Sequence, residues 1–198
     1  MIDETRLLEE TRKNIFTIEP LKLVIRKTEN YLAEIEGVFK DKMGMEYYPQ
    51  FSMETEMGIE AYINMLEEKG VYIYPIIFKE ANELVGIITF SDVDEYCKRI
   101  KAGYIFHSNH WSRGFEYEVF RDVAECLRKH KWHRVEASAY SGDKVSQIIY
   151  EKCGLTLEGK LRDRQLINGK YHDELIYSTV PSREGMNAPY YSAHRDFF

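Results

Sequence analysis

The chain has 198 residues, of which 44% are hydrophobic and 14% aromatic, enough for the core of one α/β domain and too few for two. Its formal net charge of -6 at pH 7 argues against nucleic acid as a partner bound through a basic face. The three cysteines are widely separated and lack metal-ligand spacing, so we predict neither a disulfide framework nor a metal site.

The first predicted segment is a charged extension, residues 1–20. It lacks an apolar signal segment, and no later run is long enough to span a bilayer, so we expect a cytoplasmic protein with no membrane partner. The domain is predicted to cover residues 21–180. It opens with an alternating strand at 21–27, a helix from Thr28 to about residue 41, and a second helix over 53–70 that Gly70 closes.

The middle of the chain is rich in predicted strands. Residues 71–79 and 83–90 flank a short turn and predict a β-hairpin. The polar segment 91–100 is interpreted as a loop that leads to a fourth strand at 102–108. An amphipathic helix then runs to about Lys129, with one apolar stripe made of Phe115, Val119, Phe120, Val123, Ala124 and Leu127.

The last predicted elements are a fifth strand at 133–140, a shorter helix at 143–154 that begins at Ser141 or Asp143, and two strands at 157–167 and 170–180. Asn168-Gly169 joins these two strands and is typical of a tight hairpin turn. The aromatic tail, 181–198, is interpreted as either disordered or docked. Together the elements predict an α/β (α+β) domain with a mixed, mostly antiparallel seven-stranded sheet, about four helices and one parallel β-α-β crossover.

The start of the helix near Gly114 is the first candidate for a binding site. The first N–H groups of a helix have no partner within the helix, and a glycine lets an anion approach them closely. Ser112 offers a capping hydroxyl and Arg113 a cation. The same pattern also fits an ordinary capped helix, and Glu116 places a negative charge where an anion would lie.

A series of separated motifs extends from the fourth strand to the last one. They comprise Gly103-Tyr104, Trp111, Gly114, Glu118, Arg134, Glu136-Ala137, Ser146, Glu151-Lys152, Gly154, Gly159, Arg162, Asn168-Gly169, Asp173 and Tyr177. In their order and spacing these motifs resemble the GNAT superfamily, and most closely its ribosomal-protein N-terminal acetyltransferases. Ser112 and Glu116 depart from the pattern, which has a glycine and a small residue there, and so do Asp143, in place of asparagine, and Leu155, in place of phenylalanine.

The resemblance implies a GNAT-like domain in which strands four and five splay apart and acetyl-CoA, the cosubstrate, lies in the wedge. The backbone of Phe106 and His107 would meet the pantetheine arm, which Asp143 and Ser146 would flank, and Lys152 would lie near the nucleotide. The pyrophosphate loop would comprise Trp111, Ser112, Arg113, Gly114, Phe115, Glu116 and Tyr117. No metal is implied.

The reaction that this implies is direct attack of a neutral amine on the thioester. Tyr150 occupies the position where many acetyltransferases of this fold place a general acid. No general base is assigned, although His107 was a candidate. If Glu116 points outward, the pyrophosphate can bind, and if it points inward, it occupies the helix start itself.

The expected acceptor is the α-amine of a peptide or protein N-terminus. The alternatives are a small amine, such as a polyamine or an antibiotic, or a GNAT-fold binding module whose CoA site Glu116 impairs. Acidic residues would suit a cationic acceptor, although solvated surfaces explain them equally well: Glu54, Glu56, Glu60, Glu67, Glu68, Asp92, Asp94 and Glu95. Whether the chain forms a homodimer is left open.

Overall fold

The computed structural model describes residues 23–25, 30–48, 51 and 57–179. The expected extension 1–20, the capping residue Thr28 and the tail 181–198 lie outside these ranges. The described strands are β1 (Leu23–Ile25), β2 (Tyr72–Phe78), β3 (Glu83–Asp94), β4 (Arg99–Phe106), β5 (Arg134–Tyr140), β6 (Thr156–Ile167) and β7 (Lys170–Thr179). The described α-helices are α2 (Leu32–Lys40), α3 (Lys42–Met45), α4 (Ile59–Glu68), α5 (Phe115–Lys129) and α6 (Lys144–Lys152).

The strands form one seven-stranded sheet in the order β1-β2-β3-β4-β5-β7-β6. Neighbouring strands are antiparallel except for β4 and β5, which are parallel and are joined through α5. The predicted mixed sheet with one parallel crossover is therefore confirmed. The Asn168-Gly169 turn is confirmed as well, since both residues have the positive φ angles, 50° and 73°, that a tight hairpin turn requires.

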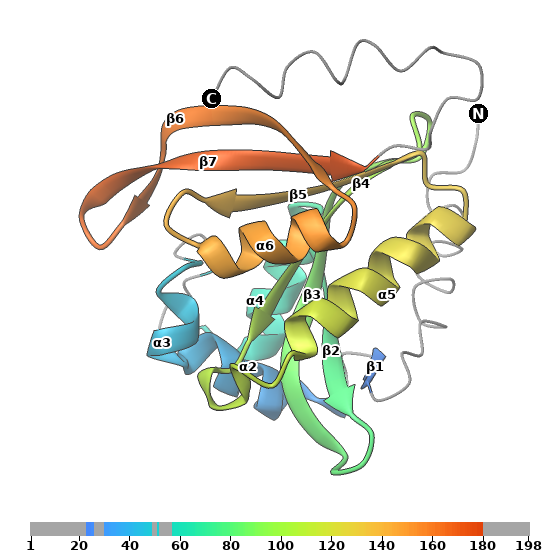
Figure 1. The fold of residues 1–198 in the computed structure, drawn as a ribbon. Coiled ribbons are helices and arrows are strands. Elements are labelled where there is room, and N and C mark those ends of the chain that lie inside the picture. Colours follow the sequence, from blue (N-terminus) through green and yellow to red (C-terminus); the bar gives the residue numbers. More distant parts are fainter. Residues whose placement is uncertain (1–22, 26–29, 49–50, 52–56, 180–198) are drawn as a thin grey trace, which may run out of the picture.

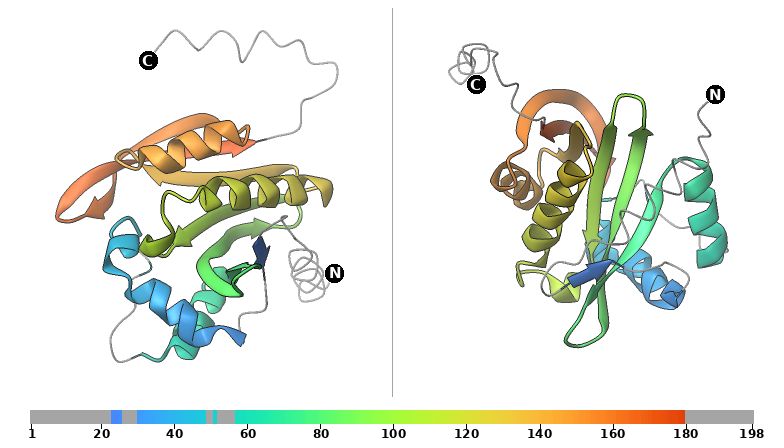
Figure 2. Two further views of the ribbon diagram at one scale, coloured as in Figure 1. Left: turned by 60° about the horizontal axis from the view of Figure 1, so that its bottom comes forward. Right: turned by 90° about the vertical axis from the view of Figure 1, so that its right-hand side faces the viewer.

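Helices cover both faces of the sheet (Figures 1 and 2). Helices α2 and α4 pack on one face, where Ile73, Ile87 and Ile105 project from the central strands. Helices α5 and α6 pack on the other face, because alternate strand residues point the opposite way. The apolar stripe predicted for α5 is confirmed, since all six of its side chains are buried. No helix in the described part of the chain combines the length and the apolar character that crossing a membrane requires.

Several predicted elements differ from the structure. The segment 91–100 is not a loop: β3 and β4 continue as a hairpin, with an irregular register between Ser91 and Asp94. Its polar side chains lack the alternation that would have indicated strands. Helix α4 begins only at Ile59, because Gly58 is its N-cap. The short helix α3 was not predicted, and Asp41 caps it by accepting a hydrogen bond from the N–H of Met43.

The two central strands splay apart at one end of the sheet. Only three residue pairs, from Arg99–Arg134 to Lys101–Glu136, hold β4 and β5 in register. Beyond them β4 continues to Phe106 and β5 to Tyr140 without pairing with each other, and the two strands visibly diverge (Figure 1). The predicted splay of strands four and five is therefore present, and backbone groups at its inner edges lack a strand partner.

Candidate active site

The loop that follows β4 delivers the start of α5 to the open end of the splay. Gly114 is the N-cap of α5, with a φ of 78° and no side-chain cap. The first helical bond runs from the N–H of Glu118 to the carbonyl of Gly114, at 3.3 Å, so the N–H groups of the first turn have no helical acceptor. The predicted cap Ser112 does not cap the helix. It has a φ of 63°, the left-handed conformation that glycine adopts without strain.

At the end of β4, the backbone N–H and carbonyl groups on one side of the strand face the splay. The N–H of His107 donates to Val85 of β3, at 3.1 Å, and the His107 carbonyl accepts from His110. Since backbone groups of a strand alternate between its two edges, the N–H of Phe106 faces β5 across the splay. The Phe106 carbonyl accepts from Nε1 of Trp111, at 3.2 Å. Two residues were expected to meet a pantetheine arm. The backbone N–H of Phe106 faces the open side of β4, whereas the N–H and carbonyl of His107 are already bonded to Val85 and His110.

The charged side chains of Arg113 and Glu116 have different surroundings near the first turn of α5. The Arg113 guanidinium lies 4.5 Å from the ring centre of Phe115 and 5.2 Å from that of Phe78, so the loop holds it at the rim. The Glu116 carboxylate is partly buried, and this burial raises its pKa, while a hydrogen bond from its own backbone N–H acts in the opposite direction. The Glu116 carboxylate is therefore protonated more readily than that of an exposed glutamate, and its own backbone N–H, in the first turn of α5, favours the charged form.

Helix α6 forms the opposite wall of the splay. Asp143 caps it by accepting a hydrogen bond from the N–H of Ser146, at 3.0 Å. The hydroxyl of Ser146 is buried and lies 3.0 Å from the hydroxyl of Tyr104 on β4. This pair thus bridges the gap between β4 and α6. Lys152 lies in the last turn of the same helix and is exposed, two turns away from the cap.

A cluster of phenols surrounds Ser146 in the splay. The Tyr150 hydroxyl donates to the carbonyl of Ser138, at 3.4 Å, and the Tyr150 ring packs near that of Tyr104, with 6.2 Å between ring centres. Burial raises the pKa of Tyr48, Tyr104 and Tyr150. The nearby Tyr150 hydroxyl raises the pKa of the other two further, and Asp143 raises that of Tyr150. All three phenols are therefore protonated at neutral pH and can act as hydrogen-bond donors.

Residues 41–48 cross the mouth of the splay and connect its two sides. On the β4 side, the Asp41 carboxylate accepts from the backbone N–H and the hydroxyl of Ser108. On the β5 side, the ring of Tyr47 stacks on Tyr140, with 5.5 Å between ring centres. Glu46 accepts from the side-chain amide of Asn168, at 2.7 Å, in the β6–β7 turn. We refer to residues 41–48 as the strap.

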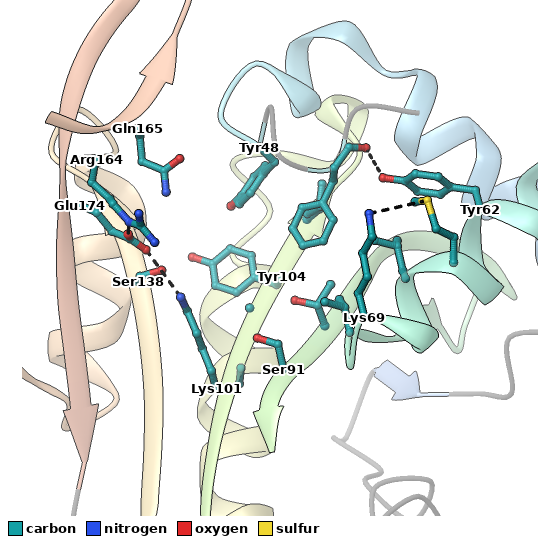
Figure 3. A pocket seen from close by; sticks show the side chains of 18 of the residues that line it. Tyr48, Tyr62, Lys69, Ser91, Lys101, Tyr104, Ser138, Arg164, Gln165 and Glu174 are labelled. Atoms are coloured by element: carbon teal, nitrogen blue, oxygen red, sulfur yellow. Dashed lines mark hydrogen bonds and ion pairs between the residues drawn. The ribbon is translucent and has the colours of Figure 1, made fainter. Parts of the chain in front are cut away.

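A cavity of about 610 Å³ adjoins the phenol cluster on the face of the sheet that α4 covers. Its walls come from the strap, α4, β3, β4, β5 and the β6–β7 hairpin, and Figure 3 shows the polar side chains around it. Tyr48, Tyr104, Ser138 and Tyr150 line its side next to the splay. Its volume lies in the range of small-molecule sites, and its position lets a second substrate meet a ligand held in the splay.

Charged side chains from three strands lie on the wall opposite α4. Glu174 of β7 is buried, and its carboxylate oxygens lie 3.6 Å from Nζ of Lys101 and 3.6 Å from Nε of Arg164. These three residues and Tyr48 are not among the site residues expected from the sequence. Lys101 lies between two apolar residues, as a solvent-facing strand residue would, and Glu174 follows another acid, Asp173. The sequence therefore gives no sign that either side chain faces a cavity.

Of the carboxylates that were expected to attract a cationic acceptor, those in the described part of the chain do not line this cavity. Asp94 and Glu95 lie in the β3–β4 hairpin, at the end of β4 where it still pairs with β5, and they contact Arg99 and Lys98. Glu60 and Glu68 are exposed on α4 and are not among the lining residues, whereas Glu54 and Glu56 lie outside the described residues.

His107 faces the strap and does not line the cavity. Its Nδ1 accepts from the N–H of Asn109, at 3.2 Å, and lies 3.6 Å from the Asp41 carboxylate. The His107 ring therefore lies at the contact between the strap and the end of β4. Among the described residues, no group of three or more histidine, cysteine, aspartate or glutamate side chains could hold a metal ion.

Comparison with known proteins places this geometry in a family. The family model described as "Acetyltransferase (GNAT) domain" matches residues 22–156. The chain is 28% identical over 173 residues to the uncharacterized N-acetyltransferase YoaA of Bacillus subtilis (strain 168), which covers 84% of this chain and 98% of YoaA. It is 21% identical over 164 residues to the ribosomal-protein-serine acetyltransferase of Escherichia coli (strain K12), covering 82% of this chain and 87% of that enzyme.

Solved structures show the same fold. RimL, a ribosomal L7/L12 alpha-N-protein acetyltransferase solved in complex with CoA, superposes with a TM-score of 0.70 at 19% identity, covering 84% of this chain and 97% of RimL. The spermidine N-acetyltransferase of Vibrio cholerae, solved with CoA and spermine, superposes with a TM-score of 0.69 at 16% identity, covering 80% and 95% of the two chains. The fold is thus shared by relatives with different acceptors.

Proposed function

Because the chain belongs to the GNAT acetyltransferase family and is an acetyl-CoA-dependent acyltransferase, we propose that its acceptor is the α-amine of a peptide or protein N-terminus. The prediction that it is an enzyme of this class is confirmed by the family match and by its N-acetyltransferase relatives. The choice of acceptor is our proposal, since relatives of this fold include enzymes named for ribosomal proteins and for spermidine.

The residues around the splay fit acetyl-CoA. The free edge of Phe106 and the Ser146 wall would hold the pantetheine arm, and the first turn of α5 would hold the pyrophosphate. Bound there, acetyl-CoA supplies an acetyl thioester next to the cavity. In the reaction, the nitrogen of the neutral amine forms a bond to the acetyl carbon, the carbon–sulfur bond breaks, and one proton passes from nitrogen to sulfur, so the products are an N-acetyl amide and CoA thiol. An acceptor that starts as the ammonium form first releases one further proton.

Tyr150 is the residue that we propose to assist the leaving sulfur. Its hydroxyl lies at the junction of the splay and the cavity, where it donates to the carbonyl of Ser138, at a long 3.4 Å, and lies beside the hydroxyl of Ser146. Burial holds the pKa of this phenol well above its ordinary value, whereas a thiol ionises near pH 8.5. The phenol therefore keeps its proton and stabilises the departing thiolate as a hydrogen-bond donor.

The choice of an α-amine depends on one observation, the lack of an available base in the described lining. Glu174 is the only described carboxylate that lines the cavity, and two cations already flank it. An acceptor must therefore lose its proton with little help. An α-amine has a pKa near 8, whereas the ε-amine of lysine has one of about 10.4, so at neutral pH the α-amine supplies far more of the reactive neutral form.

A pair of matched peptides tests the proposal. Both contain one internal lysine and have the same sequence, but one has a free N-terminus and the other has a blocked N-terminus. We expect acetyl-CoA to acetylate the first peptide at its α-amine and to leave the second unchanged, as read by tandem mass spectrometry. Acetylation of the lysine in the blocked peptide, or faster turnover of spermidine than of the free peptide, contradicts the proposal.

A further inference from the structure

The charged lining of the cavity has the opposite sign to the chain as a whole. The chain carries a formal net charge of -6, yet the charged side chains of the described lining are Lys69, Lys101, Arg164 and one acid, Glu174. The lining is therefore net positive. An acidic protein that gathers cations around one cavity concentrates negatively charged ligands there.

The arrangement of Lys101 and Arg164 leaves them able to bind a ligand. Each lies 3.6 Å from a Glu174 oxygen, longer than a hydrogen bond from a charged nitrogen, which is about 2.8 Å. Lys101 has three donors and Arg164 has five, so one shared carboxylate leaves most of them unused. Figure 3 shows the side chains of Arg164, Glu174 and Lys101 together along one wall, facing the phenols.

Glu174 holds these cations in place rather than neutralising them. It is buried in β7, between β5 and β6, where its register partners are Tyr140 and Leu161. Its two oxygens each attract a different cation, so the charge of one carboxylate is divided between two positive groups. The wall formed by Lys101, Glu174 and Arg164, which we call the cationic wall, carries one net positive charge.

We propose that the acceptor peptide carries a carboxylate close to its N-terminal amine, and that Lys101 and Arg164 bind this carboxylate. This inference rests on the proposed function and narrows it to acidic N-termini. A guanidinium matches a carboxylate in shape and charge, and Lys101 adds a second contact. A polyamine would instead bring further positive charges to the cationic wall, which repels them.

The test compares three peptides that differ only at the second residue, which is glutamate, glutamine or lysine. We expect the wild-type enzyme to have a kcat/KM at least 10-fold higher for the glutamate peptide than for the glutamine peptide, and the lowest value for the lysine peptide. In Arg164→Gln and in Lys101→Gln, the ratio between the glutamate and glutamine peptides should fall below 3.

Arg128→Gln is the matched control, because it removes the same charge from an exposed site in the last turn of α5, on the other face of the sheet. Its ratio should equal that of the wild type. Circular dichroism and acetyl-CoA titration establish that each variant is folded and binds its cosubstrate. These readouts separate a lost preference from a damaged protein.

The outcomes distinguish this inference from the function on which it rests. Equal turnover of the glutamate and glutamine peptides, or a preference for the lysine peptide, overturns the inference while the proposed function stands. A preference for glutamate that survives both Arg164→Gln and Lys101→Gln also overturns it, because the carboxylate then binds elsewhere. If acetyl-CoA binds but no peptide α-amine is acetylated, the proposed function itself is contradicted.

Discussion

Tyr150 is placed so that its hydroxyl can act on the reaction without holding the fold together. The hydroxyl makes a long hydrogen bond to the Ser138 carbonyl and lies beside Ser146, while the ring packs against Phe120 and Tyr177. Replacement by phenylalanine keeps the ring and removes only the donor. The consequences should therefore be confined to catalysis.

For Tyr150→Phe we expect kcat to fall about 100-fold, the lower end of the range for a lost acid–base group, with little change in the KM for acetyl-CoA. Steady-state kinetics with a fixed peptide measures both parameters. Tyr177→Phe is the control, because this neighbouring phenol is buried outside the cavity lining. Equal losses in the two variants would show that Tyr150 is only a packing residue.

Glu116 decides how readily the first turn of α5 accepts a pyrophosphate. A carboxylate about 4 Å from a phosphate is unfavourable by roughly 4 kcal/mol at an effective dielectric constant of 20, although rotation into water relieves part of this. Glu116→Gln removes the charge and keeps the size. We therefore expect acetyl-CoA to bind this variant about 10-fold more tightly at neutral pH, as measured by isothermal titration calorimetry.

The pH dependence of the same comparison follows from the raised pKa of Glu116. Above this pKa the side chain is charged and repels the ligand, and below it the side chain is neutral, as glutamine is. The affinity advantage of Glu116→Gln should thus shrink as the pH falls from 8 to about 5, near the ordinary range of a glutamate pKa. Glu118→Gln, in the same turn, is the control, and a constant advantage across pH would contradict this account.

At the scale of elements, the strap links parts that are far apart in the sequence. Asp41 caps α3 and also accepts two hydrogen bonds from Ser108, beyond the end of β4. Burial alone raises the pKa of Asp41, but these hydrogen bonds and the nearby His107 outweigh it and leave the pKa below its ordinary value. The charged form of Asp41 is therefore stabilised in the folded protein.

Asp41→Asn should lower the free energy of unfolding by about 2 kcal/mol at pH 7, the value of a hydrogen-bonded charged group. A group with a lowered folded pKa contributes stability above its unfolded pKa of about 3.9 and loses it as the pH falls through the folded pKa. The difference between wild type and variant should hence shrink in acid, as measured by urea denaturation at pH 7 and pH 3. An undiminished difference at pH 3 would mean that Asp41 acts through its shape and not its charge.

In the whole molecule, the sheet consists of two parts that are joined by a short stretch of pairing between two strands. One part is β1 to β4 with α2 and α4, the other is β5 to β7 with α6, and only three residue pairs join β4 to β5. The strap and α5 make further connections across the splay. A ligand in the splay would add contacts to both parts at once.

Acetyl-CoA should consequently protect the inner edge of β4, around Phe106, from hydrogen exchange, and it should stabilise the whole fold. At a concentration of 100 times its Kd, a ligand that binds only the folded state adds about 2.7 kcal/mol. ADP, which has a pyrophosphate and no pantetheine arm, should protect the start of α5 and leave β4 unchanged. Protection of β4 by ADP, or none by acetyl-CoA, would mean that the splay does not hold the pantetheine arm.

By itself the sequence determined the order of the elements, the turn at Asn168-Gly169 and the family, because apolar periodicity, turn residues and spaced motifs are local properties of the chain. It did not determine the hairpin at 91–98 or α3, whose polar residues follow no period. It also did not indicate that Ser112 takes a left-handed conformation, which the surrounding loop imposes.

Only the tertiary structure decided how the site is composed. Tyr48, Lys101, Arg164 and Glu174 come from the strap, β4, β6 and β7, and their side chains meet because the sheet splays and the hairpin closes against the strap. The partial burial of Glu116 was likewise open until the first turn of α5 had its place in the fold. Chemistry that depends on side chains from distant segments is fixed by packing, since no short stretch of sequence records which strands become neighbours.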